Sequence, residues 1–444
     1  MESKRIVITT FGSLGDLHPY LALALGLKAR GHRVTIATSP FYQPKVESEG
    51  IGFHAVRPNL SPDDTELIKL IMDARKGSEY VIRRVVMPSL RDSYEDLTAA
   101  VSGADLLITH PITYAGPVVA AKTGVRWVST VLAPLCFFSK YEPPALAPLP
   151  WLAKLGPLGP GVNGAITKLA KRISRSWSDP VRELRRELGL DAGADPIFEG
   201  QHAPDLVLAM FSPLFGAPQP DWPPNTYVTG FAFYDRLDRE KGLPGELAQF
   251  LDSGPAPIVF TLGSSAVMDA GGFYAESAKA AAQLGRRAVL LIGRDPANAP
   301  ATALPAGIVT AEYAPFSEIF PRAAAIVHQG GAGTTAQALR AGRPMLFVPF
   351  AHDQPDNAAR VVRLGIAREV SRNRYRARRV ASELRELLEN AAYAARSAEV
   401  GSQIQSEDGV ATACDLIERR FDCKKSASAA SYRDGVATIA DGNL

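Results

Sequence analysis

The sequence predicts an α/β protein with two facing, Rossmann-like, doubly wound domains, each built on a parallel sheet, and a cleft between them. Three observations support this fold class. The chain has 444 residues, more than a single domain usually holds. Hydrophobic residues make up 46% and charged residues 21%, as is typical of globular proteins. Short apolar runs alternate with helical patterns in two series, which indicates parallel strands joined by helices.

The first series begins with a strand at Arg5–Thr10, a glycine-containing turn over 11–19, a helix at Tyr20–Arg30 and a strand at Val34–Thr38. A strand, helix and strand in this order form a right-handed unit with parallel strands. Further strand-like runs follow at Leu106–Thr109, Trp127–Val131 and Leu206–Met210. We therefore expect a first domain over residues 1–225.

Prolines and charged turn residues then interrupt the pattern, so residues 226–254 are expected to form a linker. A second series over 255–405 predicts a second domain of the same kind. Its expected strands are Ile258–Thr261, Ala288–Ile292, Ile308–Thr310, Ala325–His328 and Met345–Val348. Doubly wound folds bind ligands at the carboxyl ends of their strands, so the site should lie between the domains. Residues 406–423 are expected to form a helix that packs back on the first domain, and 424–444 a mobile tail.

Charge and cysteine content exclude several classes of protein. The formal net charge of +3 is too small to indicate nucleic acid as a partner. Three cysteines without metal-ligand spacing predict neither a disulfide framework nor a metal site, and a reducing, cytoplasmic location is expected. No apolar run reaches the roughly 18 residues that span a bilayer. Six arginines between Arg368 and Arg379 leave weak peripheral membrane contact open, although a solvated surface explains them more simply.

The segment Pro134–Pro160 contains seven prolines among leucine and aromatic residues. A loop this apolar would cause aggregation if it were fully exposed. We therefore expect it to pack as a subdomain, to line an apolar pocket, or both.

Three strand-to-helix turns, at residues 11–16, 262–265 and 328–335, combine glycine with hydroxyl side chains. Backbone N–H groups at a helix start, together with the helix dipole, stabilise an anion. The third turn, HQGGAGTT, is the strongest candidate for a diphosphate site, because it adds a histidine and two threonines to three glycines. The first turn lacks the dinucleotide fingerprint Gly-x-Gly-x-x-Gly, which disfavours a nicotinamide dehydrogenase.

The stretch HQGGAGTTAQALRAGRPMLFVPFAHDQPDN, residues 328–357, resembles the donor-binding signature of the family 1 nucleotide-sugar glycosyltransferases, which have the GT-B fold. The start FGSLGDLHPYLALALGLKARGHRVTIAT is similar to the first strand–helix–strand unit of the bacterial members and of sterol glucosyltransferases. The stretches APQPDWPPNTYVTGFAFYD and LAQFLDSGPAPIVFTLGSS are similar to the rhamnosyltransferase of rhamnolipid synthesis and related bacterial enzymes. The resemblance covers about residues 5–420. It implies that the first domain, 1–225, binds the acceptor and that the second, 255–405, binds the nucleotide-sugar donor.

The resemblance implies a donor site made of three groups of residues. The diphosphate cradle would consist of Ser264, His328, Gly331, Gly333 and Thr334. Asp353 and Gln354 match the acid–glutamine pair that holds the hydroxyl groups of the donor sugar, a task suited to a carboxylate and an amide. The nucleobase loop would contain Tyr313, Ala314 and Pro315.

Two positions depart from the plant members of this family. Those members have a tryptophan in the base loop and a ribose-binding glutamate eight residues after the histidine, where this chain has Tyr313 and Ala336. Gln337 is a candidate substitute for the glutamate. Both UDP-glucose and dTDP-linked sugars such as dTDP-rhamnose therefore remain candidate donors.

The resemblance also implies an inverting displacement at the anomeric carbon, without an essential metal or other cofactor. An acceptor hydroxyl needs a general base, which contributes roughly a hundred- to ten-thousand-fold in rate. Aligning Pro19 with the family places Asp16 at the base position, with His110 as an orienting or relay partner and His18 as a lesser candidate. Helix capping is the alternative role for Asp16, and a satisfied strand-end histidine is the alternative for His110.

These expectations combine into one predicted function and two alternatives. The predicted enzyme moves a hexose from a nucleoside diphosphate sugar to a hydroxyl of a small lipophilic acceptor, such as a flavonoid or other polyphenol, a sterol, a polyketide or a hydroxy-fatty-acid. The alternatives are a nucleotide-sugar epimerase and a catalytically silent two-lobed binding or auxiliary protein. The lipophilic acceptor is inferred from the apolar Pro134–Pro160 segment and from the resemblance.

Overall fold

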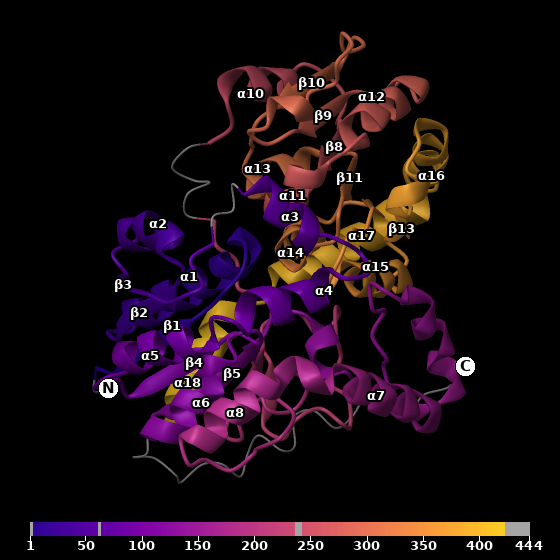
Figure 1. Cartoon of the computed structure of the whole chain (residues 1–444). Coiled ribbons are helices and arrows are strands. Elements are labelled where there is room, and N and C mark those ends of the chain that lie inside the picture. Colours follow the sequence, from indigo (N-terminus) through magenta and orange to yellow (C-terminus); the bar gives the residue numbers. More distant parts are fainter. Residues whose placement is uncertain (1–2, 61–63, 236–241, 422–444) are drawn as a thin grey trace, which may run out of the picture.

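The computed structural model describes residues 3–60, 64–235 and 242–421. It contains two parallel sheets, of seven and six strands, stacked as two lobes (Figure 1). The mobile tail expected at 424–444 lies outside the described residues. The two-domain α/β architecture predicted from the sequence is therefore confirmed.

The first sheet has the strand order β3-β2-β1-β4-β5-β6-β7, and all neighbours pair in parallel, for example Ile6 with Val34. Its strands are β1 Arg5–Thr9, β2 Arg33–Thr38, β3 Gly52–Ala55, β4 Leu106–Thr109, β5 Arg126–Val131, β6 Val207–Ala209 and β7 Thr226–Val228. The helices of this part of the chain are α1 Leu14–Ala29, α2 Gln43–Ser48, α3 Thr65–Ile71, α4 Gly77–Tyr80, α5 Leu90–Ala100, α6 Ala115–Thr123, α7 Pro160–Ser174 and α8 Asp179–Glu187.

The second sheet has the order β10-β9-β8-β11-β12-β13 and is also fully parallel. Its strands are β8 Ile258–Thr261, β9 Ala288–Leu291, β10 Ile308–Ala311, β11 Ala325–His328, β12 Met345–Phe347 and β13 Ala367–Glu369. The remaining helices are α10 Gly245–Asp252, α11 Gly263–Ala266, α12 Phe273–Gln283, α13 Phe316–Ile319, α14 Ala332–Ala341, α15 Gln354–Arg363, α16 Ala377–Glu389, α17 Ala391–Gln405 and α18 Gly409–Phe421.

Three boundaries differ from the sequence-based expectation. Helix α1 begins at Leu14 instead of Tyr20, because Ser13 and Asp16 form a capping box that starts the helix six residues earlier. The expected linker 226–254 begins with β7, whose residues pair with β6 as the edge of the first sheet. The short edge strands β3 and β13 were also not among the expected strands. Edge strands of three or four residues carry little apolar pattern, so pairing with a neighbour defines them.

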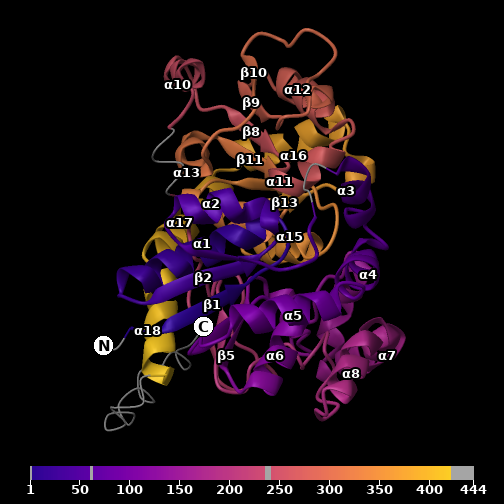
Figure 2. The same ribbon diagram turned by 60° about the vertical axis from the view of Figure 1, so that its left-hand side comes forward.

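The chain returns to the first lobe at its end, where α18 crosses beside the first sheet (Figures 1 and 2). A Cβ on Gly26 of α1 would contact Cys414 of α18, so the two helices approach closely. Arg30 ion-pairs with Asp415 and Glu418, each at 2.6 Å. Helix α18 therefore ties the end of the described chain to α1.

The apolar segment predicted at Pro134–Pro160 packs partly against both lobes. Phe137 stacks on Trp222 with ring centroids 4.2 Å apart. The Ala145 N–H donates to Asp356 of α15 at 2.9 Å, and Glu142 ion-pairs with Arg360 of the same helix at 2.6 Å. The segment therefore bridges the two lobes.

Replacing Arg360 with methionine is expected to lower the free energy of unfolding by about 3 kcal/mol, because it leaves the buried Asp356 carboxylate without its partner. The matched control is Arg363→Met, since Arg363 also pairs with Glu142 but is 56% exposed. That control should cost less than about 1 kcal/mol. Urea denaturation of both variants is the measurement, and equal losses would contradict a stabilising role for the buried pair.

Candidate functional site

The glycine turn after β1 places a carboxylate at the carboxyl edge of the first sheet. Gly12 has a φ of +130°, and a Cβ there would overlap the Asp16 carboxyl group. The backbone N–H and Oγ of Ser13 donate to Oδ2 of Asp16, at 2.7 and 3.1 Å. Asp16 therefore does cap the helix, as the alternative interpretation proposed. Only one of its oxygens is used for this, so capping leaves Oδ1 available for another role.

Oδ1 of Asp16 lies 3.6 Å from Nε2 of His110, which follows β4. Burial lowers the pKa of His110, and the nearby Asp16 charge opposes this shift. The imidazole is therefore favoured in its neutral form. Nδ1 of His110 is buried and makes no hydrogen bond to any described residue. The structure thus brings together Asp16 and His110, two of the three residues that the sequence singled out for proton transfer. This pair is called the dyad below.

His18, the third candidate, lies elsewhere. Its ring packs against Tyr234 with a centroid distance of 5.0 Å. Burial, helped by the charge of Lys45, lowers the pKa of His18 to about 3. His18 is two residues after Asp16 in α1, about half a helical turn, and it packs toward the segment that follows β7.

The turn after β11 contains the predicted diphosphate cradle. Gly330 has a φ of +95°, and its N–H donates to Nδ1 of His328 at 3.1 Å. Nδ1 is therefore the acceptor nitrogen, so Nε2 carries the proton of the neutral ring. Burial lowers the pKa of His328 to about 3. Nε2 is buried and has no hydrogen-bond partner among the described residues, so it is an unused donor, as an anion-binding group would be.

The two glycine turns meet across the lobe boundary. A Cβ on Gly333, in the first turn of α14, would lie 3.6 Å from Cα of Gly15 in α1. Asp16 immediately follows Gly15, so the dyad and the start of α14 face the same space. Gly331 is the N-cap residue of α14, which leaves the first N–H groups of this helix directed toward that space.

The turn after β8 joins the same site from the second lobe. Gly263 has a φ of +64°, and a Cβ there would overlap Nε2 of Gln329 and lie 3.2 Å from Oγ1 of Thr334. Ser264 follows it and is exposed. The close approach of these two turns places Ser264 beside the predicted cradle.

Replacing Gly263 with alanine is expected to weaken binding of a nucleoside diphosphate about tenfold or more, because the added Cβ displaces Gln329 and Thr334. Gly271→Ala is the matched control. Gly271 also has a positive φ, +54°, but a Cβ there meets nothing within 4 Å. Isothermal titration of both variants with dTDP separates the contact from backbone strain. If both variants bound dTDP equally weakly, the predicted role of the contact at Gly263 would be contradicted.

Asp353 and Gln354 lie at the start of α15, next to the cradle. Nδ2 of Asn357 donates to Oδ2 of Asp353 at 2.7 Å and to the carbonyl of Gly330 at 2.9 Å. Oε1 of Gln354 accepts from the N–H groups of Phe350 and Ala351, which leaves its amide nitrogen as the atom suited to a ligand. Asn357 is the residue that sequence reasoning missed. It closes the quoted signature, and it joins the acid to the glycine turn.

Burial raises the pKa of Asp353 to about 7. A carboxyl group with a raised pKa takes up a proton on folding, so this group costs stability as pH rises from its ordinary value to about 7. Asp353→Asn is therefore expected to raise the free energy of unfolding by roughly 2 kcal/mol at about pH 8, and by little at about pH 4. Thermal unfolding at both pH values is the measurement. A gain independent of pH would contradict the raised pKa.

The predicted nucleobase loop follows β10. Tyr313 is 53% exposed, whereas the side chains of Ala314 and Pro315 are buried. Tyr313 is thus the only side chain of the three predicted residues that is exposed enough to stack on a base. Ala314 and Pro315 instead shape the loop.

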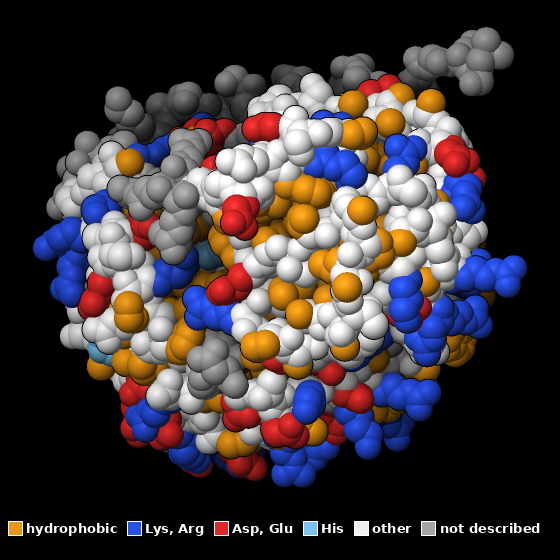
Figure 3. Space-filling view, turned by 90° about the horizontal axis from the view of Figure 1, so that it is seen from above, with side chains coloured by type: hydrophobic (Ala, Val, Ile, Leu, Met, Phe, Trp, Pro, Cys, Tyr) orange, Lys and Arg blue, Asp and Glu red, His pale blue; other side chains and the backbone are white. Residues whose placement is uncertain are grey.

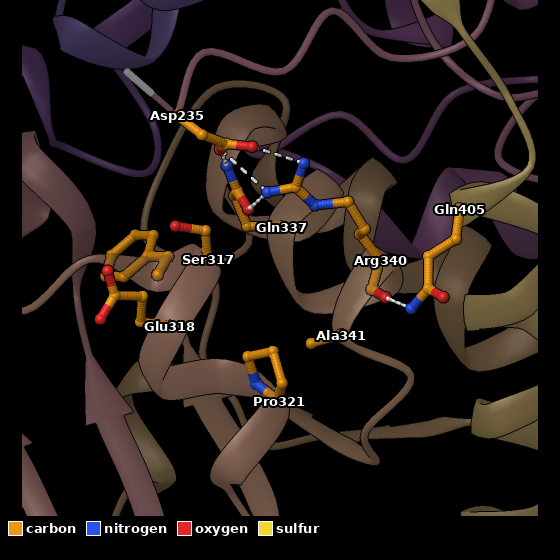
Figure 4. A pocket seen from close by; sticks show the side chains of 9 residues that line it. Asp235, Ser317, Glu318, Pro321, Gln337, Arg340, Ala341 and Gln405 are labelled. Atoms are coloured by element: carbon orange, nitrogen blue, oxygen red, sulfur yellow. Dashed lines mark hydrogen bonds and ion pairs between the residues drawn. The ribbon is translucent and has the colours of Figure 1, made fainter. Parts of the chain in front are cut away.

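A cavity of about 380 Å³ lies between α13 and α14 (Figure 4). Asp235 enters it from the first lobe and accepts from Arg340 at 2.7 and 2.9 Å, and from Gln337 at 3.0 Å. Figure 4 shows these three side chains directed toward one another. The sequence suggested Gln337 alone. Its partner Arg340 is three residues away, but Asp235 is 102 residues away along the chain, and no local pattern reveals that contact.

The arginine run on the second lobe is largely engaged in contacts within the chain. Arg368 and Arg379 pair with Glu383, and Arg372 pairs with Asp269 and lies over the ring of Phe350. Lys and Arg side chains gather toward the right of Figure 3, the side of α16 in Figure 1. Peripheral membrane contact through this run stays a prediction.

Membrane spans and metal clusters are both absent from residues 3–60, 64–235 and 242–421. None of the helices there is long and apolar enough to cross a membrane. Within the same residues, no group of three or more His, Cys, Asp or Glu side chains is placed to hold a metal ion.

Family models match both halves of the chain. Residues 279–414 match the erythromycin biosynthesis protein CIII-like C-terminal domain, and residues 6–88 match the glycosyltransferase family 28 N-terminal domain. The O-mycaminosyltylonolide 6-deoxyallosyltransferase of Streptomyces fradiae is 32% identical over 441 residues, which are 95% of this chain and 99% of that enzyme. A sterol 3-beta-glucosyltransferase of Cryptococcus neoformans is 30% identical over 96% of this chain, but the match spans only 28% of that longer protein.

Solved structures share the fold at low sequence identity. The calicheamicin glycosyltransferase superposes with a TM-score of 0.69 at 18% identity, over 95% of this chain and 99% of its own. The glycotransferase of kitacinnamycin gives 0.68 at 23% identity, over 94% and 99%. The spinosyn rhamnosyltransferase, solved with thymidine diphosphate, gives 0.64 at 18% identity, over 93% and 100%.

Proposed function

Because this protein belongs to the family 1 nucleotide-sugar glycosyltransferases with the GT-B fold, we propose that it transfers a deoxyhexose or hexose from a nucleoside diphosphate sugar to a hydroxyl group of a lipophilic acceptor. The chain is a glycosyltransferase. Its donor, acceptor and mechanism are the proposal. The single observation that carries it is the meeting of two turns: Asp16, paired with His110, faces the same space as the start of α14.

The proposed base is Asp16. Its Oδ1 takes the proton of the acceptor hydroxyl while the acceptor oxygen attacks the anomeric carbon. The bond from that carbon to the donor phosphate oxygen breaks at the same time, so the configuration at the anomeric carbon inverts. The neutral His110, 3.6 Å from Oδ1, orients the carboxylate, and the capping bonds from Ser13 hold its other oxygen.

The leaving nucleoside diphosphate carries the negative charge of the broken bond. Nε2–H of His328, the hydroxyl of Ser264 and the N–H groups at the start of α14 are suited to receive it, as preorganised donors. These groups would stabilise the charge without a divalent cation. Asp353 and Gln354, joined to the cradle through Asn357, would hold the hydroxyl groups of the sugar.

We infer a dTDP-linked sugar as the preferred donor. The relative that is 32% identical is named for transfer of a 6-deoxyallose, and three solved proteins of this fold were solved with thymidine diphosphate. Tyr313 would supply the face on which the base stacks. Gln337 and Arg340, at the adjacent cavity, offer polar groups to the ribose.

A donor-by-acceptor matrix read by mass spectrometry tests this function. dTDP-rhamnose, dTDP-glucose and UDP-glucose would each be combined with a macrolide aglycone, a sterol and a flavonoid, in the presence of chelator. The proposal expects a mass gain of one sugar on at least one acceptor, with a dTDP donor preferred. Interconversion of donor sugars without an acceptor product would support an epimerase instead, and donor binding without any turnover a silent binding protein.

A further inference from the structure

Exposed apolar side chains are concentrated on one segment outside the site described above. Of the twelve large hydrophobic side chains that are exposed in the described residues, seven lie between residues 141 and 173. The most exposed are Ile173 at 65%, Leu158 at 62%, Leu169 at 58% and Trp151 at 54%. This segment comprises the 3₁₀ turn Pro150–Leu158 and helix α7, which lie at the periphery of the first lobe in both ribbon views (Figures 1 and 2).

Three of the exposed residues form an apolar stripe along helix α7. Val162, Leu169 and Ile173 are separated by seven and four positions, which places them on a single face of α7. Leu158 lies just before the helix, at the end of the 3₁₀ turn. A different face of the helix is held by the protein: Asn163, about 100° round the helix from Val162, is buried and donates to the carbonyls of Lys140 and Gly156. Helix α7 therefore directs its apolar stripe away from the protein, the reverse of an ordinary surface helix.

The charged side chains of residues 143–178 are all positive. Residues 143–178 contain no Asp or Glu but five cations, so they carry +5 in a chain whose formal net charge is +3. The cations are Lys154, Lys168, Lys171, Arg172 and Arg175. Lys168 and Arg172 are exposed and directly precede Leu169 and Ile173, so they border the apolar stripe. Lys171 is paired with Glu199.

We propose that Pro150–Leu158 and α7 form a docking surface for an anionic membrane, with the helix lying in the plane of the interface. An apolar stripe bordered by Lys and Arg, with Trp151 beside it, combines burial into the acyl boundary with attraction to anionic headgroups. A second copy of the chain is disfavoured as the occupant, because a two-fold contact on this face would bring like charges together.

Docking through this surface, which includes the last part of the Pro134–Pro160 segment, would place the rest of that segment next to the bilayer, where lipophilic hydroxylated molecules concentrate. The inference does not depend on the proposed function, since it rests on the exposure, spacing and charge of residues outside the catalytic site.

Vesicle flotation with the full chain tests the proposal. Phosphatidylcholine vesicles would be compared with vesicles of equal parts phosphatidylcholine and phosphatidylglycerol. The bound fraction is expected to be high only with the anionic vesicles. Leu169→Glu/Ile173→Glu and Lys168→Gln/Arg172→Gln should each lower the partition coefficient about tenfold or more. Leu70→Glu, which changes a leucine of α3 that is 49% exposed, is the matched control and should bind like the wild type.

Circular dichroism and glycosyl transfer to a water-soluble acceptor would show that the variants are folded, since α7 lies outside the catalytic site. Three results would overturn the proposal. The first is no flotation of the wild type with anionic vesicles. The second is flotation that Leu169→Glu/Ile173→Glu leaves unchanged. The third is a dimer that this double variant dissociates, without vesicle binding, which would assign the surface to a second copy.

Discussion

Replacing Asp16 with asparagine is expected to lower kcat by about 10²- to 10⁴-fold, because the amide cannot take the proton of the acceptor hydroxyl. The substitution is conservative for the fold. An asparagine oxygen can still accept from the N–H and hydroxyl of Ser13, as Asp16 does at 2.7 and 3.1 Å, so the start of α1 is preserved. The dissociation constant for dTDP should stay close to that of the wild type, since the base contacts the acceptor.

Asp408→Asn is the matched control for capping. Asp408 accepts from the N–H of Ala411 at the start of α18, so this variant perturbs a helix cap far along the chain from the dyad and should keep the wild-type kcat. Steady-state kinetics and titration with dTDP are the measurements. If Asp16→Asn turned over like the wild type, Asp16 would be a capping residue only.

Replacing His328 with alanine is expected to lower kcat about 10²- to 10³-fold. This is the usual effect of removing one preorganised hydrogen-bond donor to a developing anion. The side chain is fully buried, and its Nε2–H is held ready by the bond from Gly330 N–H to Nδ1. Because burial lowers the pKa of His328 to about 3, this donor is neutral throughout the working range. The rate should therefore show no titration from His328 between about pH 5 and 9.

His32→Gln is the control for loss of a buried histidine. His32 is 7% exposed and bonds to Glu418 of α18 at 3.1 Å, at the amino end of β2, whereas the site lies at the carboxyl ends of the strands. The kcat of His32→Gln should remain near the wild-type value. Equal losses in both variants would indicate damage to the fold, and a full kcat in His328→Ala would remove His328 from the donor site.

Much of the fold could be predicted because buried parallel strands have distinctive sequences. β1, β4, β8 and β11 are apolar runs of four or five residues, each followed by a turn, and all were predicted. The predicted start of α1 was wrong. Pro19 and two glycines indicated a turn, but the capping box between Ser13 and Asp16 starts the helix at Leu14. β7 was missed because it is only three residues long, comes just after Pro223 and Pro224, and is defined by its pairing with β6.

The candidate site was predictable to the extent that it lies on local turns. Asp16, His328 and Gly333 are in glycine turns whose chemistry is visible in the sequence. Their proximity to one another depends on how the lobes pack, and so does the pairing of Asp235 with Arg340, 105 residues apart. Asn357 was missed because its role arises from two contacts to different turns, at Asp353 and Gly330.

The anomeric configuration of the product tests the central claim most directly. The wild-type enzyme would be given an α-linked nucleoside diphosphate glucose and an accepted acceptor in the presence of chelator, and the product would be analysed by proton NMR. A single displacement with Asp16 as base and His328 at the leaving group predicts a β-linked product. An α-linked product would contradict that displacement, because retention requires a second reaction at the anomeric carbon.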